Sequence, residues 1–231
     1  ALNLKGSVLK SLGRDAEARQ CFDRVLADDP INAYALHETA SYDDFRRFMR
    51  EQPESYLELA IQYWHNGFTD TAVNLLKEID ARVPYPTVKM YLGYLTGEDR
   101  YFGEALSLPV GYCAPFRLET IPVLEKAKSV CPDSSLPYYY LGNLYYNIQP
   151  DNAIREWEKC VEMQPDNALA WRILGWAHWL HTKDYARSAD CYRKAIGLNP
   201  DAALYLEECD QVLEALGTPV RERYDLLKSH H

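Results

Sequence analysis

The stretches that decide the fold are YYYLGNLYYNIQPDNAIREWEKCVEMQP, residues 138–165, and WRILGWAHWLHTKDYARSADCYRKAIGLNP, residues 171–200. Each places a glycine inside an apolar helical pattern, and these glycines, Gly142 and Gly175, are 33 residues apart. Prolines that follow an apolar stretch recur with nearly the same period, at separations of 33 and 35 residues. They are Pro132, Pro165 and Pro200. Because a proline cannot continue a helix, the spacing predicts a repeated helical unit.

A period near 34 residues is the tetratricopeptide length, and the residue types resemble that family. In the clearest repeat the matching residues are Trp171, Leu174, Gly175, Tyr192, Ala195 and Pro200. The repeat before it supplies Tyr138, Leu141, Gly142, Tyr145, Ala153, Trp157, Cys160 and Pro165. The same frame fits Gly6, Gly13, Ala18, Phe22 and Pro30, and then Tyr56, Leu59, Ala60, Tyr63, Gly67, Ala72 and Pro84. The resemblance implies an all-α, right-handed superhelix (α-solenoid) of tetratricopeptide-like (TPR-like) helix hairpins, which we expect to form a single domain over residues 1–231.

Apolar spacing, glycines and prolines together predict where the helices lie. We expect helix pairs at about 1–28, 54–81, 135–163 and 168–198, and two short helices within 31–50. Residues 86–96 are predicted to be a first helix whose partner is delayed until about 118–131. A terminal helix pair is expected at about 201–228, either as a polar cap or as a truncated edge.

The delay leaves an irregular insertion at about 97–117. Five glycines and prolines break regular structure there, yet the segment also holds seven large apolar or aromatic residues. Because it is too apolar for a solvated linker, we expect it to pack on the superhelix. It would be either a lid over otherwise exposed core or a dedicated ligand-binding loop.

Composition and charge narrow the classes of partner. The formal net charge is −9, which argues against nucleic acid and against an anionic membrane surface, because both need clustered lysines and arginines. No run of about 18 apolar residues predicts a membrane span, and the N-terminus lacks the pattern of a signal peptide. A cytoplasmic location is predicted, and the six cysteines, none in a C-x-x-C pair, suit a reducing compartment.

No residues point to catalysis or to a cofactor. Nucleophile-elbow, phosphate-loop and dinucleotide motifs are absent from the sequence, so we predict that the chain is not an enzyme. His178 and His181 are three residues apart and share a helix face, but a metal site needs further ligands. The sequence therefore predicts no metal site and no cofactor, and assigns the cysteines to packing as free thiols.

The predicted function lies in a groove. In the tetratricopeptide family the first helix of each pair lines the concave face, and the frame above places there Tyr139, Asn143, Tyr146, Arg172, Trp176 and Trp179. Tyrosine, tryptophan and arginine dominate binding hot spots. Asn143 and Arg172 resemble part of the family's carboxylate clamps, although Tyr139 and Trp176 replace the accompanying lysines. We predict a protein or peptide partner, with an acidic or carboxyl-terminal group as the preferred ligand.

A second, narrower resemblance suggests an alternative function. The order of Leu92-Gly93, the insertion, and residues 115–146 is similar to the C-terminal repeat region of large bacterial proteins that begin with a β-rich domain. In that case the chain would be an accessory helical domain, and the separate β-domain would carry any activity, for example one on carbohydrate.

Overall fold

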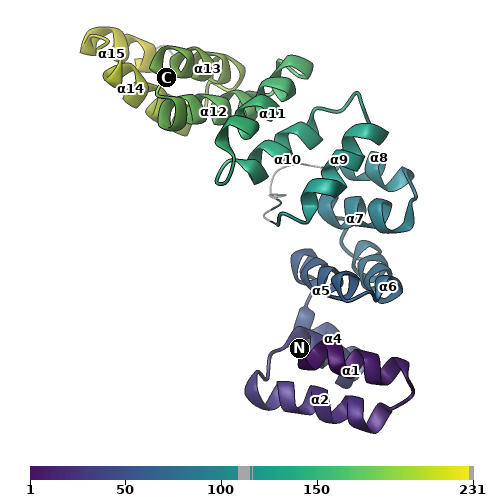
Figure 1. Cartoon of the computed structure of the whole chain (residues 1–231). Coiled ribbons are helices and arrows are strands. Elements are labelled where there is room, and N and C mark those ends of the chain that lie inside the picture. The colour runs from purple at the N-terminus through teal and green to yellow at the C-terminus, as the bar shows by residue number, and fades with distance from the viewer. Residues whose placement is uncertain (109–114, 116, 229–231) are drawn as a thin grey trace. The chain divides into compact units, whose positions relative to one another are not determined.

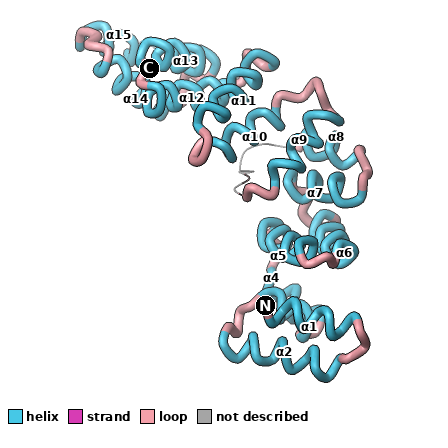
Figure 2. The backbone as a smooth tube through the Cα atoms, in the orientation of Figure 1, coloured by secondary structure: helices cyan, strands magenta, loops and turns pink. Residues whose placement is uncertain are grey.

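The computed structural model describes residues 1–108, 115 and 117–228. Within these residues all regular structure is helical (Figures 1 and 2), which confirms the all-α prediction. The chain divides into two compact units, Ala1–Val110 and Gly111–His231. Each unit is a stack of helix hairpins, and the single domain over residues 1–231 stays a prediction. No helix in the described part of the chain combines the length and the apolar character that crossing a bilayer requires.

The N-terminal unit contains hairpins in the predicted places. Its helices are α1 (Leu2–Ser11), α2 (Asp15–Asp28), α3 (Ala33–Thr39), α4 (Tyr42–Met49), α5 (Pro53–His65), α6 (Thr69–Asp80), α7 (Pro86–Thr96) and α8 (Arg100–Leu106). Local sequence sets several of these bounds. The Asn32 side chain accepts a hydrogen bond from the backbone N–H of Ala35 and so caps α3, and Pro53 opens α5 where its missing N–H costs nothing.

The C-terminal unit continues the same pattern. Its elements are α9 (Thr120–Val130), α10 (Leu136–Tyr145), α11 (Pro150–Met163), α12 (Ala168–Ala177), the π-helical turn η1 (His178–Thr182), α13 (Tyr185–Leu198), α14 (Ala203–Ala215) and α15 (Val220–Lys228). Asn167 and Asp184 cap α12 and α13 through their side chains. The terminal pair expected at 201–228 corresponds to α14 and α15.

Close approach at glycine holds the two helices of a hairpin together, as the repeat frame predicts. A Cβ atom added at Gly142 of α10 would lie 2.2 Å from Nε1 of Trp157 on α11. One added at Gly175 of α12 would lie 3.0 Å from the ring of Tyr192 on α13. Both aromatics are buried. The space that a side chain would occupy at each glycine is therefore filled by an aromatic residue from the second helix of the same hairpin.

The structure corrects the predicted partner of α7. The delayed helix, α9, packs against α10, whereas α7 packs against the short helix α8. Phe102 of α8 is fully buried, and a Cβ atom added at Gly93 would lie 2.7 Å from its ring. The sequence predicts an irregular insertion over residues 100–106, since Gly103 interrupts the helical pattern there. Gly103 faces open space and so costs the helix only its propensity. The rest of the predicted insertion, at 109–114 and 116, lies outside the described residues.

Candidate binding surface on the first helices of the C-terminal unit

The six predicted groove residues lie on the first helices of two successive hairpins in the C-terminal unit. Tyr139 and Asn143 lie on α10 with Tyr146 at its end, and Arg172 and Trp176 lie on α12 with Trp179 in η1. Within each set the residues are spaced i, i+4 and i+7, which places them on one face of a helix. The two faces lie close together, because the pKa of the Tyr146 hydroxyl, which burial raises, is lowered in turn by the nearby Trp176 side chain. The first-helix placement is therefore observed, and the concave groove itself stays a prediction.

Tyr139 and Asn143 are engaged in holding their own hairpin. The Trp157 indole N–H donates to the Tyr139 carbonyl oxygen and to Asn143 Oδ1, both at 3.2 Å. The Tyr139 side chain is buried, and burial raises the pKa of its hydroxyl against a weaker opposing effect from the nearby Asn143 side chain. Asn143 is half-buried. Of these two residues, only the exposed part of the Asn143 amide is therefore accessible to a ligand.

Arg172 already binds a carboxylate of the chain itself. Its Nε and Nη2 donate to Glu208 Oε2 and Oε1 at 2.8 Å and 2.5 Å, a bidentate arrangement. Glu208 lies on α14, the first helix of the next hairpin. The hydrogen bond to Glu208 is the largest cause that raises the pKa of Arg172, and burial opposes it. The guanidinium fork that the sequence assigned to a ligand therefore links α12 to α14.

The sequence-based prediction did not include Glu208, although its spacing carries a signal. Tyr205, Glu208, Cys209 and Val212 follow the i, i+3, i+4, i+7 pattern of a buried face. All four are buried in the structure. A carboxylate within such a pattern needs a cation nearby, because an unpaired buried charge is costly. Arg172, 36 residues earlier, supplies it.

The remaining three aromatics form the accessible part of this surface. Tyr146, Trp176 and Trp179 are each half-buried. The rings of Trp176 and Trp179 meet edge to face with centroids 5.5 Å apart, and Tyr146 lies 5.5 Å from Trp157. Such contacts fix the rings in place, so binding a partner would cost little side-chain entropy. We call Tyr146, Trp176 and Trp179 the aromatic face.

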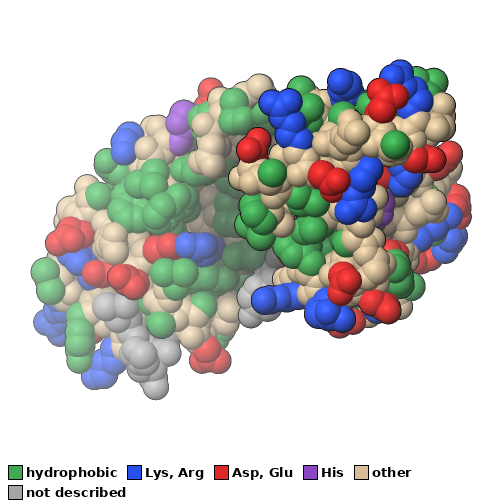
Figure 3. All heavy atoms as spheres, turned by 90° about the horizontal axis from the view of Figure 1, so that it is seen from below, with side chains coloured by type: hydrophobic (Ala, Val, Ile, Leu, Met, Phe, Trp, Pro, Cys, Tyr) green, Lys and Arg blue, Asp and Glu red, His purple; other side chains and the backbone are tan. Residues whose placement is uncertain are grey.

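Charges of both signs are mixed on the face of the molecule that Figure 3 draws. On the face drawn in Figure 3, lysines and arginines lie among aspartates and glutamates, with hydrophobic side chains between them. A surface of this kind does not create a strong single-sign field, so the local arrangement of side chains decides what binds.

The histidine pair does not form a common site. His178 is buried, its Nδ1 lies 3.3 Å from Thr182 Oγ1, and burial lowers its pKa. His181 instead reaches out to Asp151 at 2.8 Å. Cys21, Cys131, Cys160, Cys191 and Cys209 are free thiols, and Cys113 lies outside the described residues. In the described part of the chain, no three His, Cys, Asp or Glu side chains gather as metal ligands would.

Comparison with known families agrees with the helix frame. Models described as tetratricopeptide repeat match residues 1–32 and 141–203. These two segments are therefore similar to tetratricopeptide repeats. The second match spans the second half of α10 and all of α11, α12, η1 and α13, so Tyr146, Trp176 and Trp179 all lie within it.

Solved structures similar to this chain include three with low sequence identity. One is described as the MamA protein, with 18% identity, a TM-score of 0.46, and coverage of 79% of this chain and 91% of that one. Another is YrrB, described as a TPR protein with an unusual peptide-binding site, with 17% identity, a TM-score of 0.38 and 87% coverage of each chain. A third, the thermophilic TPR protein TTC0263 of Thermus thermophilus, has 20% identity, a TM-score of 0.39, and coverage of 91% of this chain and 97% of that one.

Proposed function

We propose that this chain is a protein-interaction scaffold that binds an extended peptide along α10 and α12, with the aromatic face as its anchor. The observation that carries the proposal is that Tyr146, Trp176 and Trp179 are fixed by ring contacts yet only half-buried. Rigid aromatic side chains give large contact area at low entropic cost, and they dominate binding hot spots. The scaffold acts without a catalytic centre or a cofactor, in a reducing, cytoplasmic setting.

The acidic or carboxyl-terminal ligand group is a second element of the proposal. Glu208 uses Nε and Nη2 of Arg172, so a ligand carboxylate would approach Nη1 at the outer edge of the guanidinium. A ligand in this position shares a cation whose charge is already compensated. We therefore expect the carboxylate to add less affinity than the aromatic anchors, and to act mainly on orientation.

Selection from a random peptide library displayed with free C-termini, followed by resynthesis, tests this function. We expect selected peptides to lose at least about tenfold in affinity against Trp176→Ala and Trp179→Ala, which corresponds to about 1.4 kcal/mol. Tyr224→Ala removes an exposed aromatic from α15 of the same unit and is the matched control. Far-UV circular dichroism must show that all three variants are folded.

Amidation of the selected peptides then separates the two elements of the proposal. A weaker loss on amidation than on Trp176→Ala fits the anchors as the main contacts. Unchanged binding by both folded tryptophan variants would refute the aromatic face as the site. The alternative of an accessory domain beside a β-rich domain stays a prediction, because it concerns a region outside this sequence.

A further inference from the structure

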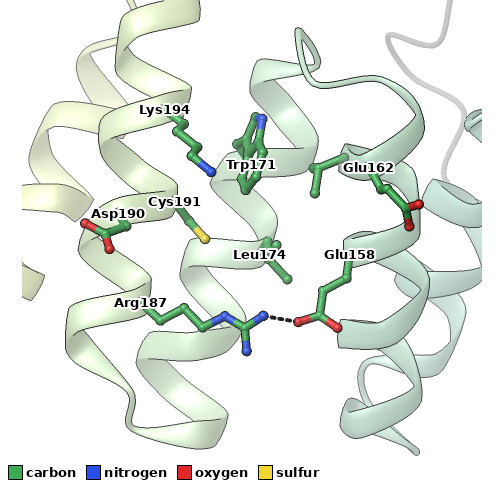
Figure 4. Close-up of a pocket in the computed structure, with 9 residues that line it drawn as sticks. Glu158, Glu162, Trp171, Leu174, Arg187, Asp190, Cys191 and Lys194 are labelled. Atoms are coloured by element: carbon green, nitrogen blue, oxygen red, sulfur yellow. Dashed lines mark hydrogen bonds and ion pairs between the residues drawn. The ribbon is translucent and has the colours of Figure 1, made fainter.

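A pocket of about 470 Å³ lies between the second helices α11 and α13, with α12 beneath it (Figure 4). From α12 it is lined by Trp171 and Leu174. An α-helix advances about 100° per residue, so these two residues point away from Arg172 and Trp176. The pocket therefore opens on a different face of α12 from the aromatic face, and the proposed function does not use it.

The floor of the pocket is apolar. Val161, Leu174 and Cys191 line it and are almost entirely buried. Burial raises the pKa of the Cys191 thiol to about 11, so the thiol is neutral and behaves as a small apolar group. At one end Arg187 is paired with Glu158, as the dashed line in Figure 4 marks. An aliphatic side chain is the group that this floor suits.

At the other end a lysine lies over an aromatic ring. Lys194 Nζ is 3.9 Å from the centroid of the Trp171 ring. The ring is held in position because its Nε1–H donates to the Pro165 carbonyl oxygen at 2.8 Å. Figure 4 shows the Lys194 side chain reaching from α13 towards Trp171 at the mouth of the pocket. The ammonium group is thus fixed beside the apolar floor while the residue stays exposed.

The acidic side chains around the pocket are each paired with another cation. Glu162 forms an ion pair with Lys159 at 3.0 Å, and Asp190 forms one with Arg193 at 2.9 Å. Glu158 is paired with Arg187. Among the residues that the structure describes, no carboxylate lies within 4.0 Å of Lys194 Nζ. The pocket therefore combines an apolar floor with a cation whose charge the chain leaves uncompensated.

The preceding hairpin provides an internal comparison. A pocket of about 350 Å³ there is lined by Lys128, Tyr138 and Glu156, and Lys128 Nζ lies 4.5 Å from the Tyr138 ring centroid. In this case the lysine also binds Glu156 at 3.2 Å and Glu125 at 3.4 Å. Of these two lysine-over-ring arrangements, only the one at Lys194 has no carboxylate to neutralise the lysine.

We propose that the pocket between α11 and α13 is a second peptide-binding site, specific for an apolar side chain next to an aspartate or glutamate. The apolar side chain covers Val161, Leu174 and Cys191. The neighbouring carboxylate pairs with Lys194 Nζ over the Trp171 ring, where charge complementarity and the partly desolvated setting favour it.

Titration with end-blocked peptides tests this site in the full chain. The probe is acetyl-Gly-Leu-Asp-Gly-amide, and the readout is the indole N–H signals in nitrogen-15 NMR spectra, assigned by tryptophan-to-phenylalanine variants. We expect the Trp171 signal to shift and those of Trp176 and Trp179 to stay in place. Peptides with asparagine for aspartate, or glycine for leucine, must bind several-fold more weakly. Shifts confined to Trp176 and Trp179, or equal binding of the asparagine peptide, would overturn the proposal.

A pair of lysine variants provides the matched control. Lys194→Met keeps an apolar stem over the ring and removes the charge, and we expect about a three- to fivefold loss of affinity for the aspartate peptide, as for an exposed ion pair. Lys228→Met removes an exposed lysine of α15 in the same unit that does not line the pocket, and should bind as wild type. Unchanged binding by Lys194→Met would overturn the proposal. Neither outcome bears on the aromatic face, which Trp176→Ala and Trp179→Ala test separately.

Discussion

Glu38 in the N-terminal unit and Glu208 in the C-terminal unit hold the same place in the repeat. Each lies eight residues after a repeat-closing proline, Pro30 and Pro200. The side chain of each carboxylate is only 7% exposed, and a cation from the preceding first helix binds it. Eight residues after the prolines Pro84, Pro132 and Pro165 the chain has apolar side chains instead, which are Leu92, Tyr140 and Ile173.

The two carboxylates are stabilised in different ways. Glu38 accepts hydrogen bonds from the Tyr63 hydroxyl at 2.7 Å, from Ser7 at 3.3 Å and from Lys10 at 2.8 Å, and the Lys10 side chain is 55% exposed. Glu208 receives the bidentate fork of Arg172, whose side chain is 22% exposed. The N-terminal carboxylate thus has neutral donors beside its cation, whereas the C-terminal one depends chiefly on its arginine. Removing the cation should therefore cost the second site far more.

The largest effect is expected from Arg172→Ala. It leaves Glu208 buried without its cation, and breaking such a pair costs about 3 kcal/mol. Hydrogen–deuterium exchange in α12 to α14, with urea unfolding of the whole chain, measures the loss. The double variant Arg172→Met, Glu208→Leu should recover most of it, because an apolar pair needs no compensation. If Arg172→Ala is as stable as wild type, the ion pair does not support the hairpin stack. This expected loss is why the tryptophan variants, rather than Arg172→Ala, test binding.

The next effect is expected from Glu38→Gln. The change keeps the shape of the side chain but removes the negative charge to which Lys10, Tyr63 and Ser7 donate hydrogen bonds. Hydrogen bonds to a charged group contribute about 1.5–3 kcal/mol, and the amide retains some of them, so we expect a loss of about 1–2 kcal/mol. Exchange rates should rise in α1, α3 and α5 and stay unchanged in α12 to α14. A rise confined to the C-terminal unit would contradict the assignment.

Lys10→Ala should be nearly neutral, which sharpens the contrast with Arg172→Ala. Because Lys10 is mostly exposed, its ion pair with Glu38 is screened by solvent and contributes about 0.5 kcal/mol. The hydroxyls of Tyr63 and Ser7 continue to satisfy the carboxylate. Urea unfolding at low and at high salt checks this, since the small contribution should shrink further as salt increases. A loss comparable with that of Arg172→Ala would show that the hydroxyls do not compensate the charge.

The smallest effect concerns pH. His37 Nδ1 lies 2.7 Å from the Tyr63 hydroxyl, and burial lowers its pKa despite the opposing influence of Glu38 and Glu78; Lys10 lowers it further. The folded state therefore takes up a proton less readily than the unfolded state, and stability falls as pH drops below about 6.5, the ordinary histidine pKa. His37→Gln should show a shallower loss of unfolding free energy between about pH 7.5 and pH 5. An identical pH dependence in variant and wild type would exclude His37 as a source of acid sensitivity.

The helix hairpins could be predicted because their determinants lie close together in sequence. Gly142 and Trp157 belong to one hairpin, and so do Gly175 and Tyr192, so a spacing rule captures both contacts. The pairing of α7 could not be found in this way. Its partner α8 is short and contains Gly103, which reads as a helix breaker, although the buried ring of Phe102 against Gly93 secures it.

The candidate site was predicted only in outline. The i, i+4, i+7 spacing places Tyr146, Trp176 and Trp179 on the faces of first helices. The same spacing cannot reveal that Trp157 engages Asn143 or that Glu208 engages Arg172. The uncompensated charge of Lys194 is equally hidden, because the sequence does not show that Lys128, another lysine over an aromatic ring, has acidic partners while Lys194 has none among the described residues.

The sequence by itself determined the repeated helix hairpin, since glycine, aromatic and proline positions recur with a period near 34 residues and act within one hairpin. Tertiary structure alone decided which polar groups the chain satisfies internally. Arg172 and Glu208 are 36 residues apart, and they meet because one hairpin stacks on the next. Such a stack brings together side chains whose separation along the chain carries no local signal, and burial then makes their pairing a requirement for the fold.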